Sequence, residues 1–231
     1  MTTAQILSQA REEKRTVLTE IEAKQILDEV GINCTRTVLA ESKQQAVSIS
    51  DEIGYPVVLK VSSVDITHKS DSGGVKVNLA DGKAVEQAYD EIMTSCRAYA
   101  PDAHIEGVSV QEMAKPGTEI IMGMIKDASF GPVVMFGLGG VLVEVLKDVS
   151  FRIVPIEKSD AVDMTTEIQG KKLLEGYRGN DPADVPFLQD MLVKLSDFVN
   201  ATEGIEEIDM NPVFAYKDGA IVVDARIILS A

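Results

Sequence analysis

A polar segment with one histidine interrupts two strand-like stretches early in the chain. Residues 60–78 read KVSSVDITHKSDSGGVKVN and follow the apolar run Pro56-Val57-Val58-Leu59. Val75, Val77 and Leu79 then alternate with polar residues, which is the period of a half-buried β-strand. The pattern predicts a strand, a polar loop and a second strand, and it constrains the fold more than any other stretch.

Three residue types in this segment suit phosphate chemistry. Gly73 and Gly74 allow backbone amides to approach a ligand, and Lys60 places a cation where the loop begins. His68 adds a nucleophile that works near neutral pH. On spacing alone, a plain Gly-Gly turn and a solvated surface histidine are the more common outcomes. Neither GxxxxGK[ST] nor a GxGxxG after a strand is present here, so neither of those phosphate loops is predicted.

Length, charge and cysteine content limit the class of protein. The 231 residues, 45% of them hydrophobic, suffice for one large domain or two small ones. No apolar run approaches the roughly 18 residues of a membrane span, and the N-terminus lacks the pattern of a signal peptide. A net charge of −15 argues against a nucleic-acid partner, although local cations and a metal can still hold a nucleotide. Cys34 and Cys96 fit two buried thiols in the cytoplasm better than a disulfide.

Helix and strand patterns alternate up to about residue 104. The capping box Thr19-Glu20-Ile21-Glu22 and the glycine at position 31 bound one helix. Further helices are expected at 4–15, 41–53 and 84–96, and strands at 35–39, 57–61 and near 75. From residue 107 strands follow closely, at 108–113, 119–125, 132–136 and 141–146, before helices at 159–168 and 185–199 and strands at 205–210 and 220–228. A mixed α and β fold with two domains is expected, 1–104 and 105–231, the first carrying the histidine loop at about 62–78.

Several acidic and amide side chains fall on or beside the later strands. Asp209 and Asn211 are two residues apart and therefore project from one face of a strand. Asp224 lies within an apolar run, where a carboxylate is costly unless it is paired or metal-bound. Carboxylate and amide oxygens suit Mg²⁺. The alternatives are a turn at Asn211-Pro212, a strand-end carboxylate at Asp224 and a solvated turn residue at Glu119.

Long segments of the chain resemble the beta subunits of ADP-forming acetyl-CoA synthetases, also called ADP-forming acetate–CoA ligases. The resemblance covers nearly the whole chain and is carried by TEIEAKQILDEVGI, GYPVVLKVSS, THKSDSGGVKVNL, FGPVVMFGLGGVLVEVLKDVSFRIVPI and EIDMNPVFAY. These subunits are small ATP-grasp proteins related to the beta chain of succinyl-CoA synthetase. The implied fold has two α+β lobes that hold ATP or ADP between antiparallel sheets.

The resemblance also implies a role for each candidate residue. His68 resembles a phosphohistidine on a swinging loop, and Asp209 the carboxylate that orients it. Lys60, Gly73 and Gly74 resemble residues that contact the nucleotide phosphates. Glu112 and Met113 resemble the strand that meets the adenine, and Glu119 the acidic residue near the ribose. Asn211 and Asp224 resemble a pair that holds Mg²⁺.

The implied activity is that of an acid–thiol ligase, acyl-CoA + ADP + phosphate ⇌ acid + CoA + ATP. An alpha subunit would bind CoA and the acid, acetate by default, in an α2β2 assembly, and the chain alone would be inactive. Two alternatives stay open. One is a stand-alone ATP-grasp carboxylate ligase, and the other is a regulatory nucleotide-binding module of a protein acyltransferase.

Overall fold

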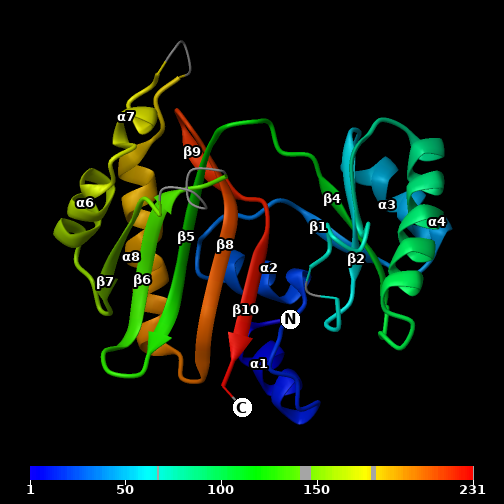
Figure 1. Ribbon diagram of the computed structural model, residues 1–231, viewed down its shortest axis with the longest axis horizontal. Coiled ribbons are helices and arrows are strands. Elements are labelled where there is room, and N and C mark those ends of the chain that lie inside the picture. Colours follow the sequence, from blue (N-terminus) through cyan, green and yellow to red (C-terminus); the bar gives the residue numbers. More distant parts are fainter. Residues whose placement is uncertain (67, 141–146, 178–180, 231) are drawn as a thin grey trace. The chain divides into compact units, whose positions relative to one another are not determined.

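The computed structural model describes residues 1–66, 68–140, 147–177 and 181–230, and it contains two units that each hold one antiparallel sheet (Figure 1). The larger unit combines residues 1–34 with 115–231, and the smaller unit comprises 35–114. The mixed α and β fold expected from the sequence is confirmed. The predicted strand at 141–146 lies outside the described residues.

The smaller unit is a four-stranded sheet covered by two helices. Its strand order is β1 (Thr37–Ala40), β4 (Gly107–Glu112), β2 (Val57–Ser62) and β3 (Val75–Leu79). Helices α3 (Lys43–Ile53) and α4 (Gly82–Tyr99) pack on one face, where Figure 1 shows them side by side. Val57, Leu59 and Val61 alternate into this core, so Lys60 projects from the opposite face of β2.

The larger unit is built on the sheet order β10 (Ala225–Leu229), β8 (Ile205–Tyr216), β5 (Thr118–Asp127), β6 (Gly131–Leu138) and β7 (Val149–Ile153). Strand β9 (Gly219–Val222) pairs with the end of β8. Ile120, Met122 and Met124 alternate into one core with α8 (Val185–Ala201), whose Leu188, Met191, Leu192 and Leu195 recur at helical spacing. Helices α6 (Lys158–Glu167) and α7 (Lys171–Leu174) complete this layer.

The first two helices belong to the larger unit. In α2 (Glu20–Glu29), Ile26 and Leu27 join the core of the larger sheet, and α1 (Thr3–Glu12) packs on α2. The predicted capping box is confirmed, because the Thr19 hydroxyl accepts from the Glu22 amide and the Glu22 carboxylate accepts from the Thr19 amide.

The units differ from the two domains expected at 1–104 and 105–231. Residues 1–34 belong to the same unit as the sheet of the C-terminal half, and β4 pairs between β1 and β2. The reason is strand pairing: β4 hydrogen-bonds along its length to both neighbours in the smaller sheet, so the chain changes unit after residue 114. A single domain boundary predicted from the order of the elements cannot account for either of these contacts between distant segments.

Two local predictions also need correction. The run 220–228 is not one strand, because β9 ends at Val222 and β10 begins at Ala225, so Asp224 lies in the break between them. Strand β7 is not among the predicted strands. Its inward side chains include Ser150, while its apolar Phe151 and Ile153 lie on the exposed face, which reverses the usual pattern.

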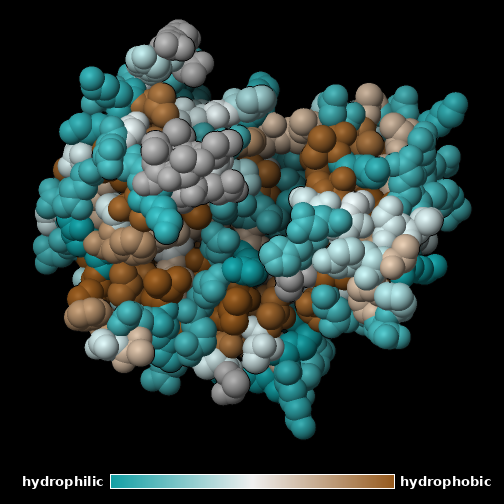
Figure 2. All heavy atoms as spheres, in the orientation of Figure 1, coloured by the Kyte–Doolittle hydropathy of each residue, from teal (hydrophilic) through white to brown (hydrophobic). Residues whose placement is uncertain are grey.

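One face of the larger sheet keeps exposed apolar side chains. Ile125 on β5, Val133 on β6 and Ile153 on β7 occupy one row across the strands. Ile125 and Ile153 are about half exposed, at 46% and 52%. Figure 2 shows brown side chains over this part of the molecule.

Candidate functional site

His68 lies at the head of a hydrogen-bonded turn between β2 and β3. The Ser72 amide donates to the His68 carbonyl at 3.3 Å, and the Gly74 amide donates to the Lys69 carbonyl at 2.7 Å. The His68 side chain is 76% exposed. An accessible imidazole in a position fixed by the turn can meet a phosphoryl group in line.

The two glycines serve the turn itself. Gly73 has a φ of +68°, a conformation that costs an L side chain energy. A Cβ on Gly74 would stand 2.6 Å from Cγ1 of Val61 and 3.0 Å from the Lys69 carbonyl. Both glycine amides donate within the turn, to Ser70 and Lys69. A contact between these amides and a nucleotide phosphate therefore stays a prediction.

Lys60 occupies the middle of the smaller sheet. It pairs with Val75 on β3 and with Ser109 on β4, and only 7% of its surface is exposed. The neighbouring strands therefore fix the backbone that carries this cation. A lysine held in this way suits a phosphate group as a point charge.

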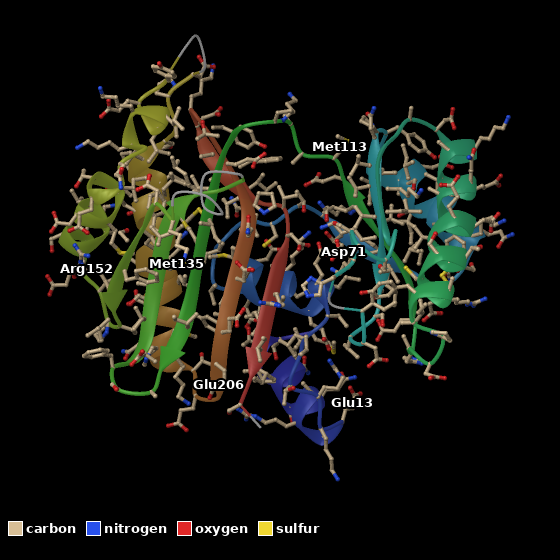
Figure 3. All side chains as sticks on the ribbon, viewed as in Figure 1. Glu13, Asp71, Met113, Met135, Arg152 and Glu206 are labelled. Atoms are coloured by element: carbon tan, nitrogen blue, oxygen red, sulfur yellow. The ribbon has the colours of Figure 1, made fainter. Side chains whose placement is uncertain are left out.

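Glu112 is the last residue of strand β4, and Met113 follows it. The Glu112 carboxylate accepts a hydrogen bond from the Arg36 amide at 3.0 Å, and the Glu112 amide donates to the Arg36 carbonyl. Met113, labelled in Figure 3, follows the last residue of the strand and is exposed. The structure thus gives the Glu112 side chain a bond within the smaller unit, and contact with an adenine stays a prediction for both residues.

Glu119 is the second residue of strand β5 and lies close to Gly139 and Gly140. The Gly139 amide donates to the Glu119 carbonyl at 2.8 Å. A Cβ on Gly140, whose φ is +62°, would lie 2.6 Å from the Glu119 carboxylate. Gly139 and Gly140 are not among the site residues predicted from the sequence. In the sequence the two glycines are marked by the Gly-x-Gly-Gly run, which also fits an ordinary turn after a strand.

Asp209 lies on the face of the larger sheet opposite the helices. Ile208 and Met210 point into the core, so Asp209 and Asn211 share the other face, as their spacing predicts. Burial raises the pKa of the Asp209 carboxyl above its ordinary value. Arg226 opposes that shift, and the nearby carboxylates of Glu207 and Asp224 add to it.

Arg226 is not among the residues predicted from the sequence, yet it lies beside Asp209. It stands directly opposite Asp209 on β10 and forms an ion pair with Glu207. Glu207 has a signal in the sequence, because it is two residues before Asp209. Arg226 has none, because its place depends on the register between β8 and β10.

Asn211 and Asp224 lie close together. Asn211 is at the register shift in the pairing of β8 with β5, and Asp224 is in the break between β9 and β10. The Asn211 amide donates to the Asp224 carbonyl at 3.2 Å, so the two predicted metal residues are neighbours. No group of three or more His, Cys, Asp or Glu side chains suited to a metal occurs among the residues that the structure describes. Two oxygen donors fit Mg²⁺, which usually takes one or two protein ligands together with waters and substrate phosphates.

The ten predicted residues thus divide between the units. Lys60, His68, Gly73, Gly74, Glu112 and Met113 belong to the smaller unit, and Glu119, Asp209, Asn211 and Asp224 belong to the larger. Within the larger unit, Asp209, Asn211 and Asp224 are brought together on one face with Glu207 and Arg226. Within the smaller unit, Lys60 and His68 lie on one strand and the connection that follows it. In the described part of the chain no helix is long and apolar enough to cross a bilayer.

Comparisons by sequence and by structure match this chain to related proteins. A model of the ATP-grasp domain matches residues 9–229. The beta subunit of ADP-forming acetate–CoA ligase I from Pyrococcus furiosus is 48% identical over 225 residues, which are 97% of each chain.

Two solved structures of acetyl-coenzyme A synthetase 1 from Ca. Korarchaeum cryptofilum are similar along almost their full chains. One, in complex with coenzyme A, Ca-AMPCP and HgCl⁺, has a TM-score of 0.96 at 48% identity, with 98% of this chain and 99% of that chain covered. The other, in complex with coenzyme A and Mg-AMPPCP, has its phosphohistidine segment pointing towards the nucleotide-binding site. It has a TM-score of 0.87 at 45% identity, over 98% and 99% of the two chains. The chain therefore belongs to the ATP-grasp family, in the group of beta subunits of ADP-forming acetate–CoA ligases.

Proposed function

We propose that this chain is the nucleotide-binding subunit of an ADP-forming acyl-CoA synthetase and that His68 carries a phosphoryl group between a CoA-binding alpha subunit and ADP. The reaction is acyl-CoA + ADP + phosphate ⇌ acid + CoA + ATP, with acetate as the default acid. An α2β2 assembly fits this division of labour. The observation that carries the proposal is the exposed imidazole of His68 on the connection that directly follows the lysine-bearing strand β2.

Different residues of this chain bind the nucleotide and transfer the phosphoryl group. Lys60 holds the nucleotide phosphates, and the ends of β4 and β5, with Glu112, Met113 and Glu119, receive the base and ribose. Asn211 and Asp224 would hold Mg²⁺, which neutralises phosphate charge when it is bound. His68 attacks through a neutral ring nitrogen and later releases the phosphoryl group to ADP.

The reverse half-reaction tests the proposal without the partner. Purified full-length chain is incubated with Mg²⁺ and ATP labelled on its γ-phosphate. Acid-labile, base-stable label on the protein is the expected result, because phosphohistidine has that stability. His68→Asn abolishes the label, whereas His104→Asn, which changes the other histidine of the chain, leaves it.

The second step identifies the role of the partner. The labelled chain is mixed with the CoA-binding subunit, the acid and CoA, and loss of label together with acyl-CoA formation is expected. Label that persists in His68→Asn would overturn the carrier role. Acyl-CoA formation by His68→Asn without a partner would instead favour a stand-alone carboxylate ligase.

Lys60→Met tests the nucleotide half of the proposal. Loss of one charge-assisted contact removes about 1.5–3 kcal/mol of binding, which is about 10- to 100-fold in Kd. Titration calorimetry with ADP and Mg²⁺ measures it. Lys83→Met, an exposed position on α4, is the matched control and should leave the Kd unchanged.

A further inference from the structure

We infer that Asp71 is a positioning residue that orients the imidazole of His68 and moves together with it. This inference rests on the proposed carrier role of His68. The Asp71 carboxylate lies 4.0 Å from Nδ1 of His68, three residues away on the same turn. Figure 3 labels Asp71 on the connection between β2 and β3.

The turn keeps the two side chains on one side of the backbone. The Ser72 amide donates to His68, the Gly73 amide to Ser70 and the Gly74 amide to Lys69, as in a short helical segment. Residues three apart in such a turn are surface neighbours. The hydroxyl of Ser72 also donates to the Lys69 carbonyl at 2.8 Å, so a side chain closes the same turn.

Buried residues on both sides of His68 and Asp71 hold the turn on the smaller unit. Ile66 is 1% exposed within the core of that unit. Ser72 is 4% exposed and lies against the thiol of Cys96 on α4, whose Sγ is 3.6 Å from its hydroxyl. His68 and Asp71 are exposed between these anchors, so a displacement of the turn carries both side chains.

Asp65 and Asp209 are outside the turn that carries His68. Asp65, in the same connection, accepts the His104 amide at 2.8 Å. Asp209 belongs to the other unit and stands opposite Arg226 on β10. Asp71 is the carboxylate that shares a turn with His68, so it can serve the ring at every stage of transfer.

The chemistry gives this carboxylate a specific task. The Asp71 carboxylate, 4.0 Å from Nδ1, is beyond hydrogen-bond distance, but its negative charge favours a proton on that nitrogen, which leaves the lone pair of Nε2 free to attack. The Nε2–P bond forms as the bond between phosphorus and the donor oxygen breaks, and Nδ1 keeps its proton. The phosphorylated ring is cationic, and Asp71 balances that charge. On transfer to ADP the Nε2–P bond breaks, a P–O bond forms on the β-phosphate, and the neutral imidazole with its Nδ1 proton is restored.

The pair contributes little to folding, which makes the inference testable. The two side chains are 76% and 74% exposed, and exposed ion pairs are weak. Asp71→Asn is therefore expected to leave the unfolding midpoint unchanged, so that an effect on transfer reports orientation of the ring.

Nitrogen-15 NMR of the full chain tests the tautomer without nucleotide or partner. The chain has two histidines, so His104 is an internal reference in the same spectrum. At a pH of about 8, His68 should show an enriched Nδ1–H tautomer. Asp71→Asn should shift it to the Nε2–H form that a free histidine side chain prefers, and Asp71→Glu should restore part of the Nδ1–H population. Identical tautomer populations in wild type and Asp71→Asn would overturn the inference.

Labelling kinetics give the second readout. With ATP and Mg²⁺, Asp71→Asn should slow phosphorylation of His68 by about 10- to 100-fold, the usual effect of losing a carboxylate that orients a functional histidine. Asp71→Glu should recover part of the rate, and Asp102→Asn, an exposed carboxylate of the same unit, should match wild type. An unchanged rate in Asp71→Asn contradicts the inference, whereas a wild-type chain that takes up no label contradicts the proposed function and leaves the tautomer result standing.

Discussion

Asp209 on β8 and Arg226 on β10 stand directly opposite each other in the antiparallel ladder of the larger sheet. The guanidinium lowers the pKa of the carboxyl, but burial and the charges of Glu207 and Asp224 outweigh it, so the net shift is upward. A half-buried carboxylate with this balance is costly to keep ionised, and such groups are frequent at functional sites.

Asp209→Asn is expected to stabilise the fold at neutral pH. Because the folded pKa of Asp209 is raised, its contribution to stability is complete below the unfolded value of about 3.9 and is lost as pH rises through the folded pKa. The ionised group therefore destabilises the protein at pH 7, and asparagine removes that cost, by up to about 1 kcal/mol.

Urea unfolding at several pH values between about 4 and 8 measures this difference, which should shrink towards the acid end. Arg226→Met is the companion variant. It removes the opposing cation, so it should raise the pKa of Asp209 further and enlarge the gain from asparagine. A variant that is less stable than wild type at pH 7 contradicts the expectation.

Asn211→Ala and Asp224→Asn should each raise the Mg²⁺ concentration needed for half-maximal labelling of His68. The two residues are joined by a backbone hydrogen bond, and loss of one ligand weakens metal binding by about tenfold or more. A chelator should abolish labelling of the wild type. Asp218→Asn, in the exposed turn between β8 and β9, is the control. Mg²⁺ curves that coincide for all four proteins would exclude this pair as metal ligands.

Gly74→Ala should destabilise the smaller unit by about 1–3 kcal/mol, the usual cost of forcing a methyl group into a packed site. The new Cβ would meet Val61 at 2.6 Å and the Lys69 carbonyl at 3.0 Å. Gly54→Ala separates this clash from backbone strain, because Gly54 has a φ of +92° and nothing within 4 Å of its Cβ position.

Chemical denaturation followed by circular dichroism measures both variants. Val61→Ala in the Gly74→Ala background should recover part of the loss, since it removes one of the clashing atoms. Wild-type stability of Gly74→Ala would show that the turn relaxes more easily than its packing indicates.

Lys24→Met should destabilise the larger unit by about 3–5 kcal/mol, because it breaks a buried ion pair with Glu20. The two side chains are 3% and 4% exposed, and their ion pair on α2 is 2.9 Å long. The double variant Glu20→Leu/Lys24→Met should regain most of the loss. Lys126→Met breaks an exposed pair with Glu206 and should cost less than about 1 kcal/mol. Equal losses for the buried and the exposed pair would contradict this prediction.

Local periodicity predicted most of the helices and strands and part of the candidate site. The Thr19 capping box, the buried face of α8 and the alternation of Ile120, Met122 and Met124 all depend on neighbours a few residues away. The same holds for Asp209 and Asn211, whose shared face follows from the period of a strand. Strand β7 was not predicted, because its buried side chains include the polar Ser150.

The local elements, the polar turn that presents His68 and the family of the chain can be predicted from the sequence. The three-dimensional fold is needed to show that residues 1–34 join the later sheet, that β4 pairs between β1 and β2, and that Arg226 opposes Asp209. The physical reason is range. Helical and strand periods are set by residues close along the chain, whereas strand order and register are set by hydrogen bonds between segments far apart, and a shift of one residue would turn Arg226 to the other face of the sheet.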